Sequence, residues 1–191
     1  GIAIANRPGT GIPPGSVGRP CPHYEVRIVD EAGLDVGPGE VGDLVFRGPA
    51  VVSGYFEGAN GSSVFREGWY HSGDLATKDT DGFFYFVERK SGMMKVAGLK
   101  VYPTEIEKAL LEHPSVREAS VVSVKDDLRG EVPKAYISLK KGAVLTAKEA
   151  LKFCRERLAH YKVPRHVEFL DELPKTTSGK INKKALQTEG L

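Results

Sequence analysis

The chain of 191 residues has few of the residues that build cross-linked or metal-bound frameworks. Its two cysteines, Cys21 and Cys154, lie far apart and form no CxxC pair, which argues against a disulfide framework or a zinc site. Its five histidines show neither HxxxH nor HExxH spacing, so no structural metal site is expected. These absences favour a reducing compartment, and we expect a cytoplasmic location.

Long apolar runs are also missing. No run approaches the roughly eighteen residues that a membrane-spanning helix needs, so no transmembrane segment is expected. The first residues, GIAIANRPG, contain neither an initiator methionine nor a basic-then-apolar signal pattern. We therefore expect the chain to be part of a longer protein.

Charge is divided unevenly although the net charge is only +2. Residues 1–87 carry 6 Lys and Arg against 11 Asp and Glu, whereas residues 88–191 carry 21 against 14. An acidic half joined to a basic half indicates two units, the second of which meets an anion. Ordinary variation of surface charge would give the same totals, so the motifs must decide.

The chain predicts an α+β fold in two parts. The first half is rich in glycine and proline, with short strand-like runs between turns, which indicates a small β-rich, barrel-like subdomain. The second half predicts the order β-β-α-β-β-α-β: Pro103 opens one helix and the capping box Thr146–Glu149 opens the other. We place the domains at residues 1–90 and 91–191, joined by a hinge.

The stretch PKTTSGKINKKAL, Pro174 to Leu186, gathers four lysines around one glycine. A phosphate-binding P-loop is excluded, because no glycine lies five positions before Gly179 and Ile181 stands where Ser or Thr is required. Nucleic-acid binding would call for interleaved aromatic residues, and none follows Pro174. A solvated tail remains open, but Gly179 and its hydroxyl neighbours favour a turn that aims Lys180 at an anion.

Two further stretches carry polar residues beside glycines. In WYHSGDL, Asp74 follows Gly73 and could accept hydrogen bonds from two vicinal hydroxyls, although the local sequence by itself favours an ordinary Asx-turn. In ERKSGMMKVAGLKVYPTEIE, basic residues surround Gly92 and Gly98. By itself that stretch reads as a charged β-hairpin.

Taken in order, the motifs GDLVFRGPAVVSGYF, GWYHSGDL, ERKSGMMKVAGLKVYPTEIE and LPKTTSGKINKKAL resemble successive signatures of the adenylate-forming enzymes. That superfamily comprises acyl-CoA synthetases, the adenylation domains of peptide synthetases and the beetle luciferases. The resemblance extends from about Gly18 to the end of the chain. The combination of GLKVYPTEIE with PKTTSGKI looks most like the acid–CoA ligase branch.

The resemblance implies an activity and its ligands. Such enzymes make an acyl-adenylate from ATP and a carboxylic acid, with Mg²⁺ on the nucleotide, and then pass the acyl group to coenzyme A. Their small C-terminal domain rotates about a hinge between the two steps.

The resemblance also implies a role for each matching residue. Lys180 falls on the catalytic lysine, Asp74 and Arg89 on the pair that holds the ATP ribose, and Lys95 on a basic residue near the adenylation site. Gly98 falls on the glycine that lets coenzyme A approach, with Lys100 beside it. Ser91 falls on the hinge.

The sequence departs from the family pattern at several points. Ser91 stands where Asp or Lys is usual at the hinge, which puts a charged hinge residue in doubt, and Glu88 stands where glycine is common. The phosphate loop and most of the acyl pocket should lie upstream and are not in this sequence. We therefore expect the C-terminal portion of a ligase, which needs its missing N-terminal portion as a partner and is inactive alone.

Two alternatives stay open. An adenylation domain of a peptide synthetase would load a carrier protein instead of coenzyme A. A stand-alone, non-catalytic binding module could retain the fold without the chemistry. The identity of the acid and the oligomeric state are not encoded in these motifs.

Overall fold

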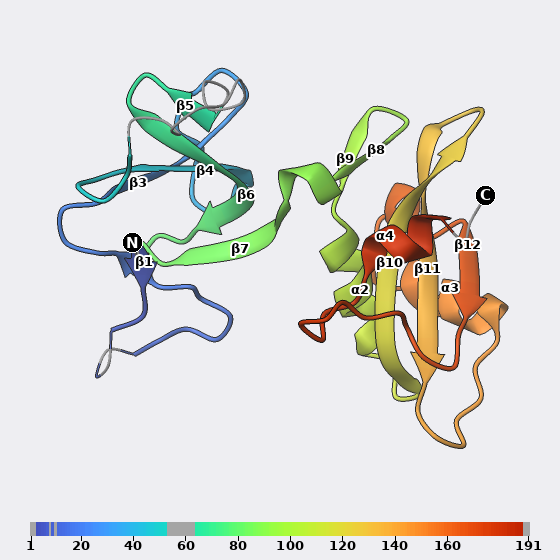
Figure 1. Ribbon diagram of the computed structural model, residues 1–191. Coiled ribbons are helices and arrows are strands. Elements are labelled where there is room, and N and C mark those ends of the chain that lie inside the picture. Colours follow the sequence, from blue (N-terminus) through green and yellow to red (C-terminus); the bar gives the residue numbers. More distant parts are fainter. Residues whose placement is uncertain (1–2, 8, 10, 53–63, 189–191) are drawn as a thin grey trace. The chain divides into compact units, whose positions relative to one another are not determined.

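The chain is represented by a computed structural model that describes residues 3–7, 9, 11–52 and 64–188. It divides into two compact units, Gly1–Ser91 and Gly92–Leu191. Both are visible in Figure 1, and together they confirm the expected mixed α+β fold. Residues 53–56 of the motif that begins at Gly42 lie outside the described residues.

The first unit is built on an antiparallel sheet in the order β3-β4-β6-β5, with β7 also paired to β6. A separate two-stranded ladder joins β1 to β2. The curl of the main sheet agrees with the expected barrel-like subdomain (Figure 1). The strands are β1 (Ile4–Ala5), β2 (Arg19–Pro20), β3 (Glu25–Val29), β4 (Gly42–Arg47), β5 (Phe65–Arg66), β6 (Trp69–Lys78) and β7 (Phe84–Arg89).

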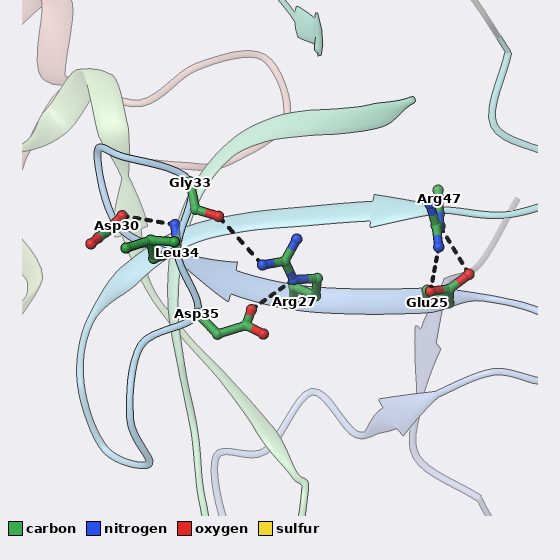
Figure 2. Close-up of polar contacts among 7 residues, drawn as sticks. All are labelled: Glu25, Arg27, Asp30, Gly33, Leu34, Asp35 and Arg47. Atoms are coloured by element: carbon green, nitrogen blue, oxygen red, sulfur yellow. Dashed lines mark hydrogen bonds and ion pairs between the residues drawn. The ribbon is translucent and has the colours of Figure 1, made fainter. Parts of the chain in front are cut away.

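Charged side chains on β3 and β4 fix one face of this sheet. The Arg47 guanidinium donates to both carboxylate oxygens of Glu25, at 2.9 and 2.8 Å, and Arg27 Nε donates to Asp35 at 2.7 Å (Figure 2). The two guanidinium groups lie 4.7 and 5.1 Å from the ring centre of Trp69. Strand register is therefore reinforced by cation–π contacts as well as by the backbone ladder.

The second unit holds a five-stranded sheet in the order β10-β11-β8-β9, with β12 parallel to β11. The expected order of strands and helices is confirmed, and a last helix follows it. The elements are β8 (Met94–Val96), β9 (Leu99–Val101), α2 (Pro103–Leu111), β10 (Val116–Asp126), β11 (Gly130–Leu139), α3 (Ala147–Arg155), β12 (His166–Phe169) and α4 (Lys183–Thr188). A 3₁₀ turn, η2 (His160–Lys162), precedes β12.

Both faces of the β10–β11 pair are buried, because strand residues alternate between two helical layers. Val121 and Ile137 face the core formed with α2 and α3. Val122 and Tyr136 face a second core that includes Leu186 of α4. In Figure 1, α4 crosses in front of these strands while α2 and α3 lie behind them.

The helices begin where their local chemistry requires. Pro103 occupies the first turn of α2, where its missing N–H costs nothing. At α3 the Thr146 side chain accepts from the Glu149 N–H while Glu149 accepts from the Thr146 N–H, which confirms the capping box. The first of these helices buries Ile106 and the second buries Cys154.

We predict that Tyr136→Phe loosens α4. The buried Tyr136 hydroxyl donates to the Leu186 carbonyl at 2.9 Å, and that carbonyl is one of the last four of α4, which lack intrahelical partners. Its loss should cost about 1 kcal/mol and speed amide exchange in α4, measured by hydrogen-exchange mass spectrometry. Tyr85→Phe, which removes a hydroxyl bond to Asp79 in the other unit, should leave α4 unchanged. Unaltered α4 exchange in the first variant would contradict the prediction.

Candidate functional site

Asp74 and Arg89 are brought together by the pairing of β6 with β7. Their Cα atoms are register partners, and Arg89 Nε lies 2.9 Å from Asp74 Oδ1. The Ser72 hydroxyl accepts from the Asp74 N–H at 3.1 Å and donates to the Leu44 carbonyl at 2.8 Å. The Asp74 backbone is thus held in place through Ser72 to the neighbouring strand.

The Asp74 carboxylate is partly buried and forms an ion pair with Arg89. Its Oδ1 is buried and accepts no properly oriented hydrogen bond from the described residues, so the short approach of Arg89 is an electrostatic contact only. Buried polar atoms normally have partners. The Arg89 cation fills that place for Oδ1, and the Asp74 side chain as a whole stays 21% exposed.

The boundary between the two units lies just after strand β7. Strand β7 runs into a single 3₁₀ turn, η1 (Lys90–Gly92), and Ser91 is the last residue of the first unit. Ser91 is exposed, and its side chain makes no hydrogen bond to the described residues.

The β8–β9 hairpin presents Lys95 and Lys100 directly opposite each other, both exposed. Opposed like charges on a ladder are unfavourable, so this pair suits a surface that meets an anion. Ala97 and Gly98 form the turn with φ of 49° and 84°. A Cβ at Gly98 would meet no atom within 4 Å, so only the backbone conformation, and not packing within the chain, calls for glycine there.

Lys180 lies at the C-terminal end of a tight turn that begins at Thr176. The Thr176 N–H donates to the Lys180 carbonyl at 2.7 Å, the Gly179 N–H to the Thr176 carbonyl at 2.9 Å, and the Asn182 N–H to the Pro174 carbonyl at 2.7 Å. Gly179 has φ of 81°, a conformation that glycine adopts without strain. The Lys180 side chain is exposed, so a well-ordered backbone carries an accessible ammonium group.

Ion pairs brace both sides of this turn. Lys175 Nζ lies 2.8 Å from Glu118 of β10, and Lys183 Nζ lies 2.9 Å from Glu107 of α2. Glu107 also accepts from the Val121 N–H at 2.7 Å. Lys183 therefore ties α4 to α2.

A basic recess of about 130 Å³ opens beside the β8–β9 turn. Its lining includes Arg129, Arg155 and Arg165 with Ala97 and Tyr161, and contains no Asp or Glu. None of the three arginines pairs with a carboxylate among the described side chains. They come from the β10–β11 turn, the end of α3 and the residue before β12, so they form no contiguous sequence motif. The excess of basic residues in the second half of the chain is the only sequence feature that points to them.

Other reactive groups offer little. Burial raises the pKa of the Cys154 thiol to about 11, so this cysteine is not a nucleophile at neutral pH. Over the described ranges, no three His, Cys, Asp or Glu side chains gather as a metal site would require. No helix in that part of the chain is long and apolar enough to cross a membrane.

The expected site residues therefore fall into three groups. Asp74 and Arg89 meet in the first unit, Lys95 and Lys100 flank the Gly98 turn in the second, and Lys180 stands on its own turn in the second.

Residues 105–180 match the family described as AMP-binding enzyme C-terminal domain, and residues 1–56 match AMP-binding enzyme. The chain belongs to the AMP-binding enzyme family. This confirms the resemblance drawn from the motifs.

Individual relatives of this AMP-binding enzyme are CoA ligases. A long-chain-fatty-acid–CoA ligase of Escherichia coli O157:H7 is 42% identical over 176 residues, which cover 92% of this chain and 31% of that protein. The 4-hydroxybutyrate–CoA ligase 1 of Metallosphaera sedula is 44% identical over 193 residues, covering 96% and 34%. ATP-bound MatB from Rhodopseudomonas palustris matches with a TM-score of 0.92 at 31% identity, covering 98% and 38%. The chain thus spans about a third of the length of these relatives.

We predict that Gly179→Ala disorders the Lys180 turn. A Cβ there would meet no atom within 4 Å, so the cost is backbone strain alone, about 1–2 kcal/mol. Amide exchange at Thr176 and Asn182 should accelerate, measured by NMR. Gly142→Ala is the matched control, because Gly142 has φ of 76° and equally open surroundings. It should cost similar stability without affecting those two amides; equal effects in both variants would contradict the prediction.

Proposed function

We propose that this chain is the C-terminal part of an ATP-dependent acid–CoA ligase. The ligase forms an acyl-adenylate from a carboxylic acid and ATP, releases pyrophosphate, and then transfers the acyl group to coenzyme A. The observation that carries the proposal is the exposed Lys180 ammonium on a turn braced by two ion pairs. The family assignment and the CoA ligases among the relatives support it.

Lys180 is the proposed catalytic residue of the first step. A carboxylate oxygen must attack the α-phosphorus, and both reactants are anions that repel each other. A fixed ammonium between them offsets this repulsion and stabilises the charge that grows on the phosphorus oxygens. Fixing the backbone beforehand matters, because a cation already in place needs no reorganisation as the reaction proceeds.

Asp74 and Arg89 are the proposed nucleotide-binding pair, with Lys95 contributing from the second unit. Two vicinal ribose hydroxyls need acceptors, and the partly exposed Asp74 carboxylate is proposed to supply them. The Arg89 guanidinium pairs with that carboxylate and adds donors of its own.

The second unit supplies the proposed coenzyme A site. Gly98 leaves open space beside its backbone for the thiol arm, and Lys100 adds a charge on the same hairpin. The adjoining recess offers three arginines to the phosphate groups and the half-exposed ring of Tyr161 to the adenine. Coenzyme A would therefore lie with its anionic end in the recess and its thiol toward Gly98.

Mg²⁺ belongs to this proposal as a companion of the nucleotide. The described residues offer no carboxylate cluster of their own to hold it, which fits an ion carried on the phosphates and neutralising the departing pyrophosphate.

In this proposal, residues 1–90 complete the nucleotide site and residues 91–191 form a mobile domain. Ser91 is the proposed hinge, between the unit that holds Asp74 and the unit that holds Lys180. The phosphate loop and acyl pocket belong to an upstream portion of the same protein, so residues 1–191 alone are expected to be inactive. A cytoplasmic location stays a prediction, based on the scarcity of cysteine.

We predict that Lys180→Ala in the full-length ligase lowers the rate of adenylation by about a hundred- to thousandfold, since one preorganised charge is lost. It should spare thioester formation from a supplied acyl-adenylate. Pyrophosphate release measures the first step, and chromatography of acyl-CoA measures the second. Lys184→Ala, on the neighbouring helix, serves as the control. Equal loss of both half-reactions would remove the role assigned to Lys180.

A second prediction concerns the recess. Arg155→Met with Arg165→Met should raise KM for coenzyme A about tenfold or more, because charge-assisted hydrogen bonds to phosphate disappear, while adenylation is unchanged. Lys141→Met with Lys148→Met removes equal charge from exposed positions outside the recess. An unchanged KM in the first pair, or an equal rise in both pairs, would place coenzyme A elsewhere.

A further inference from the structure

The end of β7 is fixed by two ion pairs made by successive residues. Arg89 contacts Asp74 of β6, as described above. Lys90 Nζ donates to Asp43 Oδ2 of β4 at 2.5 Å. Because β4 and β6 are adjacent in the sheet, the two contacts hold the strand end to two different strands.

Asp43 is a firm anchor for such a contact. Its backbone pairs with Val29 on one side and Leu75 on the other, so it lies within three paired strands. Its side chain is only 17% exposed. A carboxylate this shielded needs a cation or donor, since an unpaired buried charge is costly.

Lys90 is the cation that meets this need. Asp43 and Lys90 line a recess of about 260 Å³ together with Arg27, Trp69 and His71. Arg27 is already bonded to Asp35. Burial, and then the positive charge of Arg66, lower the pKa of His71, so its ring is neutral at pH 7 and does not compete as a cation.

The residues that follow are free of such restraint. The Ser91 side chain forms no hydrogen bond or ion pair with the described part of the chain, and Gly92 has no side chain. The 3₁₀ turn therefore begins at Lys90, whose side chain is held by Asp43, and continues through Ser91 and Gly92, which have no such contact.

We propose that Lys90 is a positioning residue: through Asp43 it holds the first residue of the η1 turn on the first unit, so that rotation of the second unit begins at Ser91. This rests on the proposed function insofar as the rotation serves two half-reactions. The Lys90–Asp43 ion pair, here called the pin, lies within the first unit and can be tested without any activity.

Hydrogen-exchange mass spectrometry on the 191-residue chain tests the pin. Lys90→Met and Asp43→Asn should each speed exchange at Ser91–Met93 about fivefold, the scale of one partly exposed ion pair. The double variant should be no faster than either single variant, and Lys90→Arg should restore slow exchange. Glu25→Gln, which breaks an ion pair elsewhere in the same sheet, is the control. Additive effects in the double variant, or equal acceleration in the control, would overturn the pin.

The full-length ligase tests the positioning role. Lys90→Met should change the ratio of the thioester-forming rate to the adenylation rate by about fivefold, whereas Lys90→Arg and Glu25→Gln should leave the ratio unchanged. Faster exchange at Ser91 with an unaltered ratio would overturn the positioning role. An unmodified protein that makes no acyl-adenylate would refute the proposed function instead, and the exchange data would still decide the pin.

Discussion

The second unit depends on the burial of both faces of one strand, β11. Its backbone pairs with β10, β8 and β12, and its side chains alternate between two cores. The β8–β9 hairpin that carries Gly98 and the chain that leads from β12 to Lys180 are both attached to this strand. Because the strand cannot shift register without moving apolar side chains out of both cores, the two candidate sites of the unit share one rigid reference.

Some cationic side chains are available to a ligand and others stabilise the fold. The difference is whether a carboxylate of the chain forms an ion pair with them. Glu118 and Glu107 form ion pairs with Lys175 and Lys183, which leaves Lys180, between them in sequence, exposed at the end of the turn. In the first unit, Asp43 and Asp74 likewise form ion pairs with the successive cations Lys90 and Arg89. A lysine-rich segment therefore gains its specificity from the acids opposite it and not from its own sequence.

Local features of the fold were predictable from the sequence because their chemistry is local. The capping box at Thr146, the proline that opens α2 and the strand alternation after Val116 all involve neighbours in the chain. The motifs likewise pointed to Asp74, Gly98 and Lys180. What local chemistry could not supply was pairing between distant residues: Asp43 and Lys90 are 47 positions apart. The basic recess stayed hidden for the same reason, since Arg129, Arg155 and Arg165 come from three separate segments.

Under the proposed function, one unit is repositioned between two half-reactions while each half of the site is kept intact, so the freedom of the chain has to be concentrated in few bonds. Every restraint found around the η1 turn follows this requirement. Arg89 and Lys90 are held by Asp74 and Asp43 up to the last residue before Ser91, and the chain is paired again from Met94 onward in β8. On that proposal the short side chain of Ser91 is expected. A charged residue there would find a partner of its own and add a restraint at the proposed hinge, where Lys90 already provides the charged anchor.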